Sequence, residues 1–334
     1  MTARHIAVVG AGAWGTALAL AAHRAGREVT LWGRDVEAIQ AARENAAYLP
    51  GIAIPPALEV TGRIADILGA DVILLATPTQ TVRSVAGQLA GMAARTPVVL
   101  CAKGLERGTR LRPSEVLAEA LPQAIAAVLS GPSFAADVAA GLPTAVTIAA
   151  GEADLAMDLC AALGSASLRP YAETDMLGVE IGGAFKNVLA IAVGIVAGRA
   201  LGASASAALI ARGFAELRRI GAALGARPET LMGLSGLGDL VLTCSTAQSR
   251  NFSYGLALGR GAPPPPVLAE GAATAAVARA LAAKFDIAMP ITDQVAAIVE
   301  GEIDVDGAMA ALMSRPFRHE SEETLPLYRK LSPP

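Results

Sequence analysis

The sequence has few of the residues that mark a disulfide scaffold, a metal centre or a nucleic-acid surface. Its 334 residues include three cysteines and three histidines, and 27 basic against 30 acidic residues give a net charge of −3. Three cysteines without paired spacing fit a reducing compartment better than a disulfide framework, so we expect a cytoplasmic protein. The histidines occur singly, without the spacing of zinc ligands, so we expect no metal. The balanced charge contains no long run of one sign, and therefore predicts neither nucleic-acid binding nor a basic membrane patch.

Long hydrophobic runs are also scarce. Residues 6–22 follow Arg4 and could be mistaken for a secretory signal, but three glycines interrupt them in the pattern of a strand, a turn and a helix. The apolar stretch 188–197 is shorter than the about 20 residues that a membrane span needs, and Lys186 and Arg199 bracket it. We therefore expect no membrane span. A G-x-S-x-G element is missing as well, which argues against an α/β-hydrolase.

The length of the chain predicts two domains, because single hydrophobic cores rarely grow beyond about 300 residues. Short β-branched runs alternate with alanine-rich helical patterns up to about residue 170, and they lie at 6–9, 28–32, 72–75, 98–100, 125–129 and 145–148. Several of these runs are continuously apolar. Continuously apolar strands that alternate with helices indicate a doubly wound, mainly parallel sheet. After Glu173 the pattern is helical. We therefore expect an α/β Rossmann-type domain over 1–178 and an all-helical domain over 179–330, with the site at the boundary between them.

The segment Gly10-Ala11-Gly12-Ala13-Trp14-Gly15 follows the first predicted strand and opens a predicted helix. That is the context in which G-x-G-x-x-G binds a dinucleotide, with the pyrophosphate at the helix N-terminus. The next strand ends at Gly33, where an acidic residue usually binds the ribose of NAD, and Arg34 follows. A guanidinium suits a 2′-phosphate, so we expect NADP. NAD remains open, because Asp35 is available for ribose hydroxyls.

Several polar side chains lie at the ends of predicted elements. Lys103 follows the strand at 98–100, at the edge where open α/β sheets bind ligands. Ser133 opens a helix after another strand and could bind a ligand or cap that helix. Ser249-Arg250-Asn251 at a helix start offers a donor set for a phosphate, or a surface cap.

Lys186 is a lone cation inside an apolar helical stretch. Burial would lower its pKa from about 10.4 and make the amine useful in proton transfer. The alternative is a surface lysine whose stem covers its neighbours while the amine reaches water.

These motifs together resemble those of the bacterial-type NAD(P)-dependent glycerol-3-phosphate dehydrogenases. The resemblance covers most of the chain and rests on these segments: Gly10-x-Gly12-x-Trp14-Gly15, Asn45 with Tyr48-Leu49-Pro50-Gly51, Ala102-Lys103-Gly104-Leu105, Ser130-Gly131-Pro132-Ser133, Glu180-x-x-Gly183-Ala184-x-Lys186-Asn187, Leu234-x-Gly236-Leu237-Gly238-Asp239-Leu240 and Ser249-Arg250-Asn251. Asp137 and Phe185 depart from the family pattern, as does the loop of four prolines at 263–266, which makes the alignment of Leu268 and Glu270 less certain.

The resemblance implies reversible hydride transfer between NAD(P)H and dihydroxyacetone phosphate, which gives sn-glycerol 3-phosphate for phospholipid synthesis. It implies Lys186 as the proton-transferring residue, Asp239 as the residue that orients it or a substrate hydroxyl, and Lys103 as a second charge that lowers the Lys186 pKa. The implied cofactor contacts are Gly10, Gly12, Ala13, Trp14, Gly15, Arg34, Tyr48, Lys103, Ala135, Arg250, Leu268 and Glu270. The implied substrate contacts are Lys103, Gly131, Ser133, Lys186, Asp239, Ser249, Arg250 and Asn251.

Two other functions remain open from the sequence. A related two-domain reductase of another small hydroxy or keto acid would also use Arg250 and Lys103 for a carboxylate. A cofactor-sensing protein without turnover could use the same fold, but it would leave the combination of Lys103, Lys186, Asp239 and Arg250 unexplained. The oligomeric state is not fixed by the sequence, which allows a homodimer.

Overall fold

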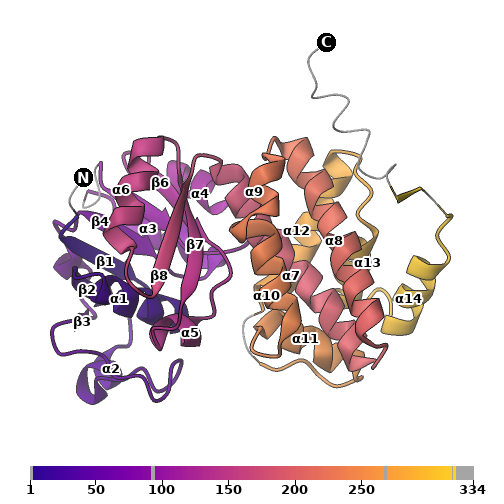
Figure 1. Cartoon of the computed structure of the whole chain (residues 1–334), viewed down its shortest axis with the longest axis horizontal. Helices are drawn as coiled ribbons and strands as arrows, with labels where there is room; N and C mark the ends of the chain where they lie inside the picture. The colour runs from indigo at the N-terminus through magenta and orange to yellow at the C-terminus, as the bar shows by residue number, and fades with distance from the viewer. Residues whose placement is uncertain (1–2, 92–94, 267–268, 318, 321–334) are drawn as a thin grey trace, which may run out of the picture. The chain divides into compact units, whose positions relative to one another are not determined.

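The chain forms two compact units, Met1–Val179 and Glu180–Pro334. The structure is a computed structural model that describes residues 3–91, 95–266, 269–317 and 319–320. Figure 1 shows a sheet with helices in the first unit and helices alone in the second. The division falls inside one long helix, α7 (Met176–Gly198).

The first unit contains an eight-stranded sheet in the order β3-β2-β1-β4-β5-β6-β7-β8. Its strands are β1 (His5–Val9), β2 (Glu28–Trp32), β3 (Glu59–Thr61), β4 (Val72–Leu75), β5 (Pro97–Leu100), β6 (Ile125–Ser130), β7 (Thr144–Ala150) and β8 (Leu168–Glu173). Neighbouring strands are parallel except β6 and β7. The doubly wound, mainly parallel sheet expected from the sequence is therefore confirmed. The sequence did not predict β3, which has three residues, or β8, an edge strand that contains Pro170.

The central strands β4 and β5 are apolar at every position, and β1 is apolar from Ile6 onward, because helices cover both faces of the sheet. In β1, Ile6 and Val8 belong to one buried cluster, whereas Ala7 and Val9 belong to the other. Successive side chains of a strand point to opposite faces, so one short run of sequence supplies both cores. The helices of this unit are α1 (Ala13–Arg24), α2 (Glu37–Ala42), α3 (Val82–Gln88), α4 (Pro113–Ala120), α5 (Ala135–Ala139) and α6 (Ala153–Leu163), with 3₁₀ turns η1 (Ile64–Ile67) and η2 (Thr79–Thr81).

The second unit is built around α7. It continues with α8 (Ala203–Leu224), α9 (Pro228–Met232), a π-helical turn η3 (Leu234–Gly238), α10 (Asp239–Ser245), α11 (Arg250–Gly259), α12 (Glu270–Lys284), α13 (Pro290–Val299) and α14 (Val305–Met313). Among the described residues, α7 is the one helix long and apolar enough to cross a membrane by length and composition. It is longer than the apolar stretch considered in the sequence, and 83% of its most apolar window is buried inside the structure. Such burial is what a helix that is apolar on all sides requires.

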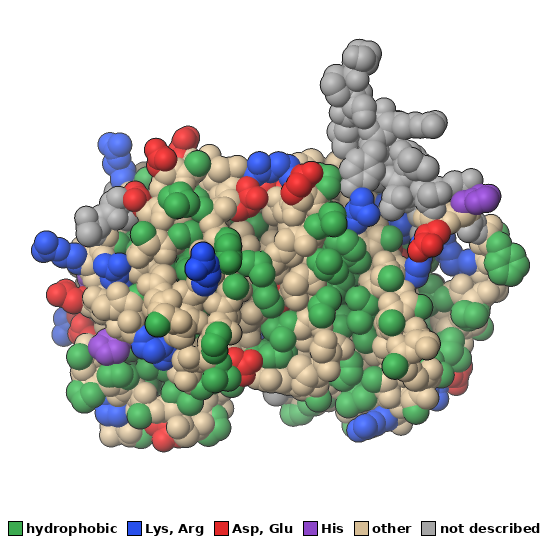
Figure 2. Space-filling view, viewed as in Figure 1, with side chains coloured by type: hydrophobic (Ala, Val, Ile, Leu, Met, Phe, Trp, Pro, Cys, Tyr) green, Lys and Arg blue, Asp and Glu red, His purple; other side chains and the backbone are tan. Residues whose placement is uncertain are grey.

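Charged side chains are dispersed over the face of the molecule shown in Figure 2. Basic and acidic groups lie among hydrophobic ones there. Some charges of the described residues are paired, such as Arg199 with Asp306 at 2.6 Å and Arg279 with Glu302 at 2.8 Å. This face therefore offers no extended field of one sign of the kind that attracts nucleic acid.

Glu216 is one of the acidic side chains that are buried in the helical unit. Glu216 of α8 is 1% exposed, and its carboxylate accepts hydrogen bonds from the Ile291 amide (2.6 Å), the Thr292 amide (3.0 Å) and the Thr292 hydroxyl (2.9 Å). These donors lie at the start of α13, so Glu216 fastens α8 to the N-terminus of α13. Burial raises the pKa of Glu216 from 4.5 to about 7, although the three donors and Arg219 oppose the rise.

We expect Glu216 to make the stability of the protein depend on pH. A folded-state pKa above the unfolded value means that the folded protein binds the proton more tightly, so this contribution to stability is full below about pH 4.5 and lost as the pH rises to about 7. Glu216→Gln cannot ionise. In urea unfolding, the free energy of unfolding of the wild type should therefore fall relative to that of Glu216→Gln by up to roughly 3 kcal/mol across this window. A relative rise would show that the hydrogen-bond donors outweigh burial.

Candidate active site

The glycine segment after β1 forms a tight turn that opens α1. A Cβ on Gly15 would lie 1.7 Å from the carbonyl oxygen of Gly10, so only glycine permits this packing of the turn against the helix. A Cβ on Gly12 would meet no atom within 4 Å, which leaves open space in front of the backbone. Gly12 is also the N-cap of α1 and provides no capping side chain, so the first amides of the helix can serve an anion.

Three buried polar atoms at this edge of the sheet have no hydrogen-bond partner among the described residues. They are the Trp14 Nε1, the Thr77 Oγ1 and the Ser130 Oγ. Each lies at or just beyond the carboxyl end of β1, β4 or β6, and these strands are parallel, so their carboxyl ends share one edge. Buried polar atoms are normally satisfied. Together with the open space at Gly12, the orphaned atoms fit a polar ligand, as the predicted dinucleotide would be.

Asn45 holds the glycine turn in place through two hydrogen bonds. It is 1% exposed, and its amide donates to the Ala11 carbonyl (3.0 Å) and to the Thr16 hydroxyl (2.7 Å). Tyr48, which follows in the same loop, is 63% exposed, and Arg34 beyond β2 is also exposed. Asn45 was part of the family resemblance, but its contact with the turn had no separate signal in the sequence.

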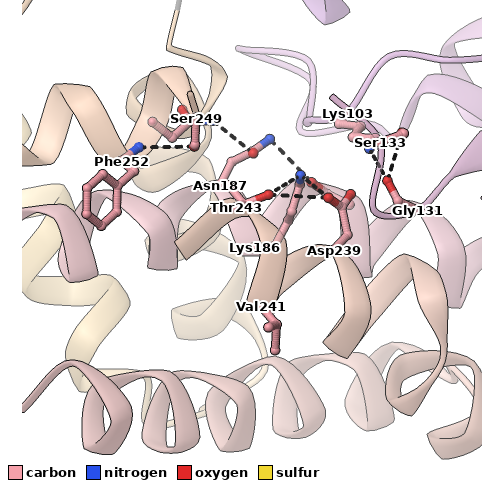
Figure 3. Close-up of polar contacts among 12 residues, drawn as sticks. Lys103, Gly131, Ser133, Lys186, Asn187, Asp239, Val241, Thr243, Ser249 and Phe252 are labelled. Carbon is pink, nitrogen blue, oxygen red and sulfur yellow. Dashed lines mark hydrogen bonds and ion pairs between the residues drawn. The ribbon is translucent and has the colours of Figure 1, made fainter. Parts of the chain in front are cut away.

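Lys103, Gly131 and Ser133 lie together beyond β5 and β6. The Lys103 amine donates to the Gly131 carbonyl at 3.1 Å, and the Ser133 hydroxyl donates to the same carbonyl at 3.0 Å (Figure 3). The N-cap of α5 is Phe134, with Ala135 as the first helical residue, so Ser133 does not cap the helix. The capping alternative for Ser133 is therefore wrong.

The loop that carries Lys103 is fastened by a buried carboxylate that sequence reasoning did not assign. Glu106 accepts two hydrogen bonds from Arg83, at 3.0 and 2.8 Å, and one from the Thr109 hydroxyl at 2.6 Å. The Arg83 guanidinium holds the pKa of Glu106 below its usual range. The Gln80 amide donates to the Leu105 carbonyl at 2.9 Å. Arg83 and Gln80 precede Lys103 by 20 or more residues, so no motif connects them to it.

Lys186 forms a buried ion pair in the helical unit. Its amine lies 2.6 Å from the Asp239 Oδ1 and 2.6 Å from the Thr243 Oγ1 (Figure 3). Lys186, Asp239 and Thr243 are 6%, 1% and 3% exposed. The alternative of a surface lysine that reaches water is therefore wrong. Thr243, which lies 57 residues from Lys186, had no signal in the sequence.

Close backbone packing brings the two partners together. Gly182 lies one helical turn before Lys186, and a Cβ there would lie 2.7 Å from the Ser235 carbonyl oxygen. The absence of a side chain lets α7 approach η3, and Asp239 is the residue at which η3 passes into α10. Thr243 follows Asp239 by one turn of α10, so both side chains reach the same amine.

In the segment Ser249-Arg250-Asn251, two side chains are buried and hydrogen-bonded and one is exposed to solvent. Ser249 is the N-cap of α11 and accepts a hydrogen bond from the Phe252 amide at 3.2 Å. Asn251 donates to Asn187 and accepts from the Gly271 amide, both at 2.9 Å, so it connects α11 with α7 and α12. Arg250 is exposed. Ser249 and Asn251 thus have structural contacts, whereas the Arg250 guanidinium is accessible to a ligand.

Glu270 and Leu268 are the two remaining predicted cofactor contacts. Glu270 is the first residue of α12 and is partly buried. Leu268 lies outside the described residues.

The cysteines do not supply a nucleophile. Burial raises the pKa of Cys101 and of Cys244 to about 12 and that of Cys160 to about 11, so all three remain thiols near neutral pH. No group of three or more potential metal ligands occurs in the part of the chain that the structure describes.

Two family descriptions match the chain. Residues 5–156 match the N-terminal part of the NAD-dependent glycerol-3-phosphate dehydrogenases, and residues 175–310 match their C-terminal part. Between them, these matches span most of both units.

Individual relatives agree with these matches. A glycerol-3-phosphate dehydrogenase [NAD(P)+] from Bradyrhizobium diazoefficiens is 59% identical over 96% of this chain and 100% of the relative. A protein of the same name from Afipia carboxidovorans is 58% identical over 94% and 98%. The crystal structure of glycerol-3-phosphate dehydrogenase from Coxiella burnetii has a TM-score of 0.89 at 41% identity, over 94% of this chain and 100% of that one. The chain therefore belongs to the NAD-dependent glycerol-3-phosphate dehydrogenase family.

Proposed function

We propose that the chain is an NAD(P)-dependent sn-glycerol-3-phosphate dehydrogenase that interconverts dihydroxyacetone phosphate and sn-glycerol 3-phosphate. The observation that carries the chemistry is the buried Lys186 amine, fixed at 2.6 Å from both Asp239 and Thr243. Family membership supplies the substrate class, since relatives of at least 58% identity bear this name. The product serves glycerophospholipid synthesis, and the enzyme acts in the cytoplasm.

Lys186 is the proton donor for reduction of the substrate ketone. The bound NAD(P)H supplies the hydride. As negative charge develops on the carbonyl oxygen, the Lys186 ammonium stabilises it and then transfers a proton, which leaves a hydroxyl group and a neutral amine. In the oxidative direction the neutral amine removes that hydroxyl proton. Asp239 and Thr243 fix the direction of the amine, and Asp239 favours its charged form whereas burial opposes it.

The first unit binds the cofactor through the glycine turn. The open space at Gly12 and the uncapped start of α1 receive the pyrophosphate, and the orphaned Trp14 Nε1 donates to the same ligand. Tyr48 and Ala135 are further cofactor contacts. Lys103, held by Gly131, contributes positive charge to both cofactor and substrate binding, and Ser133 contributes a hydroxyl.

Arg250 binds the substrate phosphate. Its guanidinium is exposed at the first position of α11, where the helix N-terminus adds its own preference for an anion. Ser249 and Asn251 hold the backbone that presents it and complete the donor set. The family resemblance also implies Arg250, Glu270 and Leu268 as cofactor contacts. A reductase of another hydroxy or keto acid is not favoured, because relatives of 56–59% identity bear the name glycerol-3-phosphate dehydrogenase [NAD(P)+].

Replacing Lys186 by methionine should reduce kcat for dihydroxyacetone phosphate by ~10²–10⁴-fold, because general acid catalysis is lost while the stem remains. The variant also removes the cation that neutralises the buried Asp239, at a cost of about 3–5 kcal/mol. The double variant Lys186→Met with Asp239→Asn removes that charge, and should recover thermal stability but not activity. Thr243→Val keeps the amine and serves as the control. Its loss of kcat should be smaller than that of Lys186→Met. A loss below about tenfold in both Lys186 variants would contradict the role.

Replacing Arg250 by alanine should raise KM for dihydroxyacetone phosphate by about tenfold or more, because a charge-assisted phosphate contact is lost. The matched control is Arg260→Ala, since Arg260 is exposed at the opposite end of α11. Steady-state kinetics with saturating cofactor would measure both. An unchanged KM in Arg250→Ala, or an equal rise in both variants, would reject a specific phosphate contact.

A further inference from the structure

The carboxyl end of β2 cannot carry the acidic side chain that usually binds the adenosine ribose of NAD. A Cβ on Gly33 would lie 2.6 Å from the Ala11 Cβ and 2.8 Å from the Val36 Cγ1. Ala11 belongs to the glycine turn and Val36 is the N-cap of α2, so neither can move without disturbing its element. The packing therefore excludes any side chain at position 33, and cofactor discrimination must come from residues around it.

The neighbouring strand places a second guanidinium beside this position. β2 and β3 are parallel, with Trp32 opposite Thr61, and the pairing continues as the Gly33 amide donates to the Thr61 carbonyl at 3.1 Å. In the same register, a Cβ on Gly62 would lie 3.8 Å from the Arg34 carbonyl oxygen. Arg34 follows Gly33 at the end of β2, and Arg63 follows Gly62 at the end of β3. Because these strands are neighbours and parallel, the two arginines lie at the same edge of the sheet.

The backbone at Arg63 is fixed, whereas its guanidinium is accessible. The Arg63 amide donates to the Thr61 hydroxyl at 3.0 Å, and that hydroxyl donates to Asp66 at 2.5 Å. The Arg63 side chain is 80% exposed and pairs with Asp66 at 3.3 Å. Exposed ion pairs of this kind contribute little to stability. The Arg63 guanidinium can therefore turn from Asp66 to a more highly charged anion at a small cost in free energy.

We propose that Arg63 is a specificity-determining residue that binds the 2′-phosphate of NADP together with Arg34. A phosphate monoester carries close to two negative charges and accepts paired hydrogen bonds from guanidinium groups. Two carboxylates oppose this charge locally, Asp35 and Asp66. Asp66 accepts a hydrogen bond from Thr61 and pairs with Arg63 when no phosphate is bound. Asp35 is available to the ribose hydroxyls of NAD, and the two carboxylates limit the preference for NADP to a graded one.

The inference rests on the proposed cofactor site, and equilibrium binding tests it without turnover. Dissociation constants of NADP+ and NAD+ would be measured by calorimetry for the wild type, Arg34→Ala, Arg63→Ala and the double variant. Arg169→Ala is the matched control, because Arg169 is an exposed arginine on β8 at the opposite edge of the sheet.

We expect Arg63→Ala to raise the dissociation constant of NADP+ by about five- to tenfold and to change that of NAD+ by less than about twofold. The loss should shrink as salt rises, because the contact is exposed. Equal effects on the two cofactors, or no effect on NADP+, would overturn the assignment of Arg63. Failure of the wild type to bind either cofactor, or to oxidise either reduced cofactor with dihydroxyacetone phosphate, would instead reject the proposed function.

Discussion

The ion pair between Lys186 and Asp239 is the constraint on which the helical unit depends. Two opposite charges lie in an apolar interior, where removal of one partner costs several kcal/mol and leaves the other unpaired. The surrounding features serve this contact: Gly182 admits η3 against α7, α10 begins at Asp239, and Thr243 adds a second acceptor for the amine. A hydrophobic pair would be simpler for stability alone. The retention of charge is therefore best explained by chemistry at the amine.

In the sheet unit, the polar residues that serve a ligand lie at the carboxyl ends of the parallel strands. Alternating apolar side chains fill the cores on both faces of the strands, and the polar residues gather where the parallel strands end. Two of these end segments are held by a buried polar side chain. Asn45 holds the glycine turn, and Glu106 with Arg83 holds the loop of Lys103. Backbone that must approach a ligand closely is thus rigid before the ligand arrives, which reduces the entropic cost of binding.

Sequence reasoning succeeded where the signal is local. The runs at 28–32 and 72–75 coincide with β2 and β4. Both are rich in apolar and β-branched residues, as strands covered on both faces are. Lys186 could be singled out because a charge inside an apolar helix is unusual. Partners that depend on tertiary contact were not predictable: Thr243 and Arg83 are ordinary residues in sequence, and the relation of Arg63 to Arg34 depends on the register of β3, a strand too short to predict.

Chemical rescue would test the role of the buried amine most directly. Lys186→Ala leaves space for a small amine, so added methylamine should restore NAD(P)H oxidation with dihydroxyacetone phosphate by about tenfold or more over the unrescued variant. The rescued rate should vary with the pKa of the amine across a series of similar size. An absence of rescue in a folded variant that still binds NAD(P)H as tightly as the wild type would contradict proton transfer by Lys186.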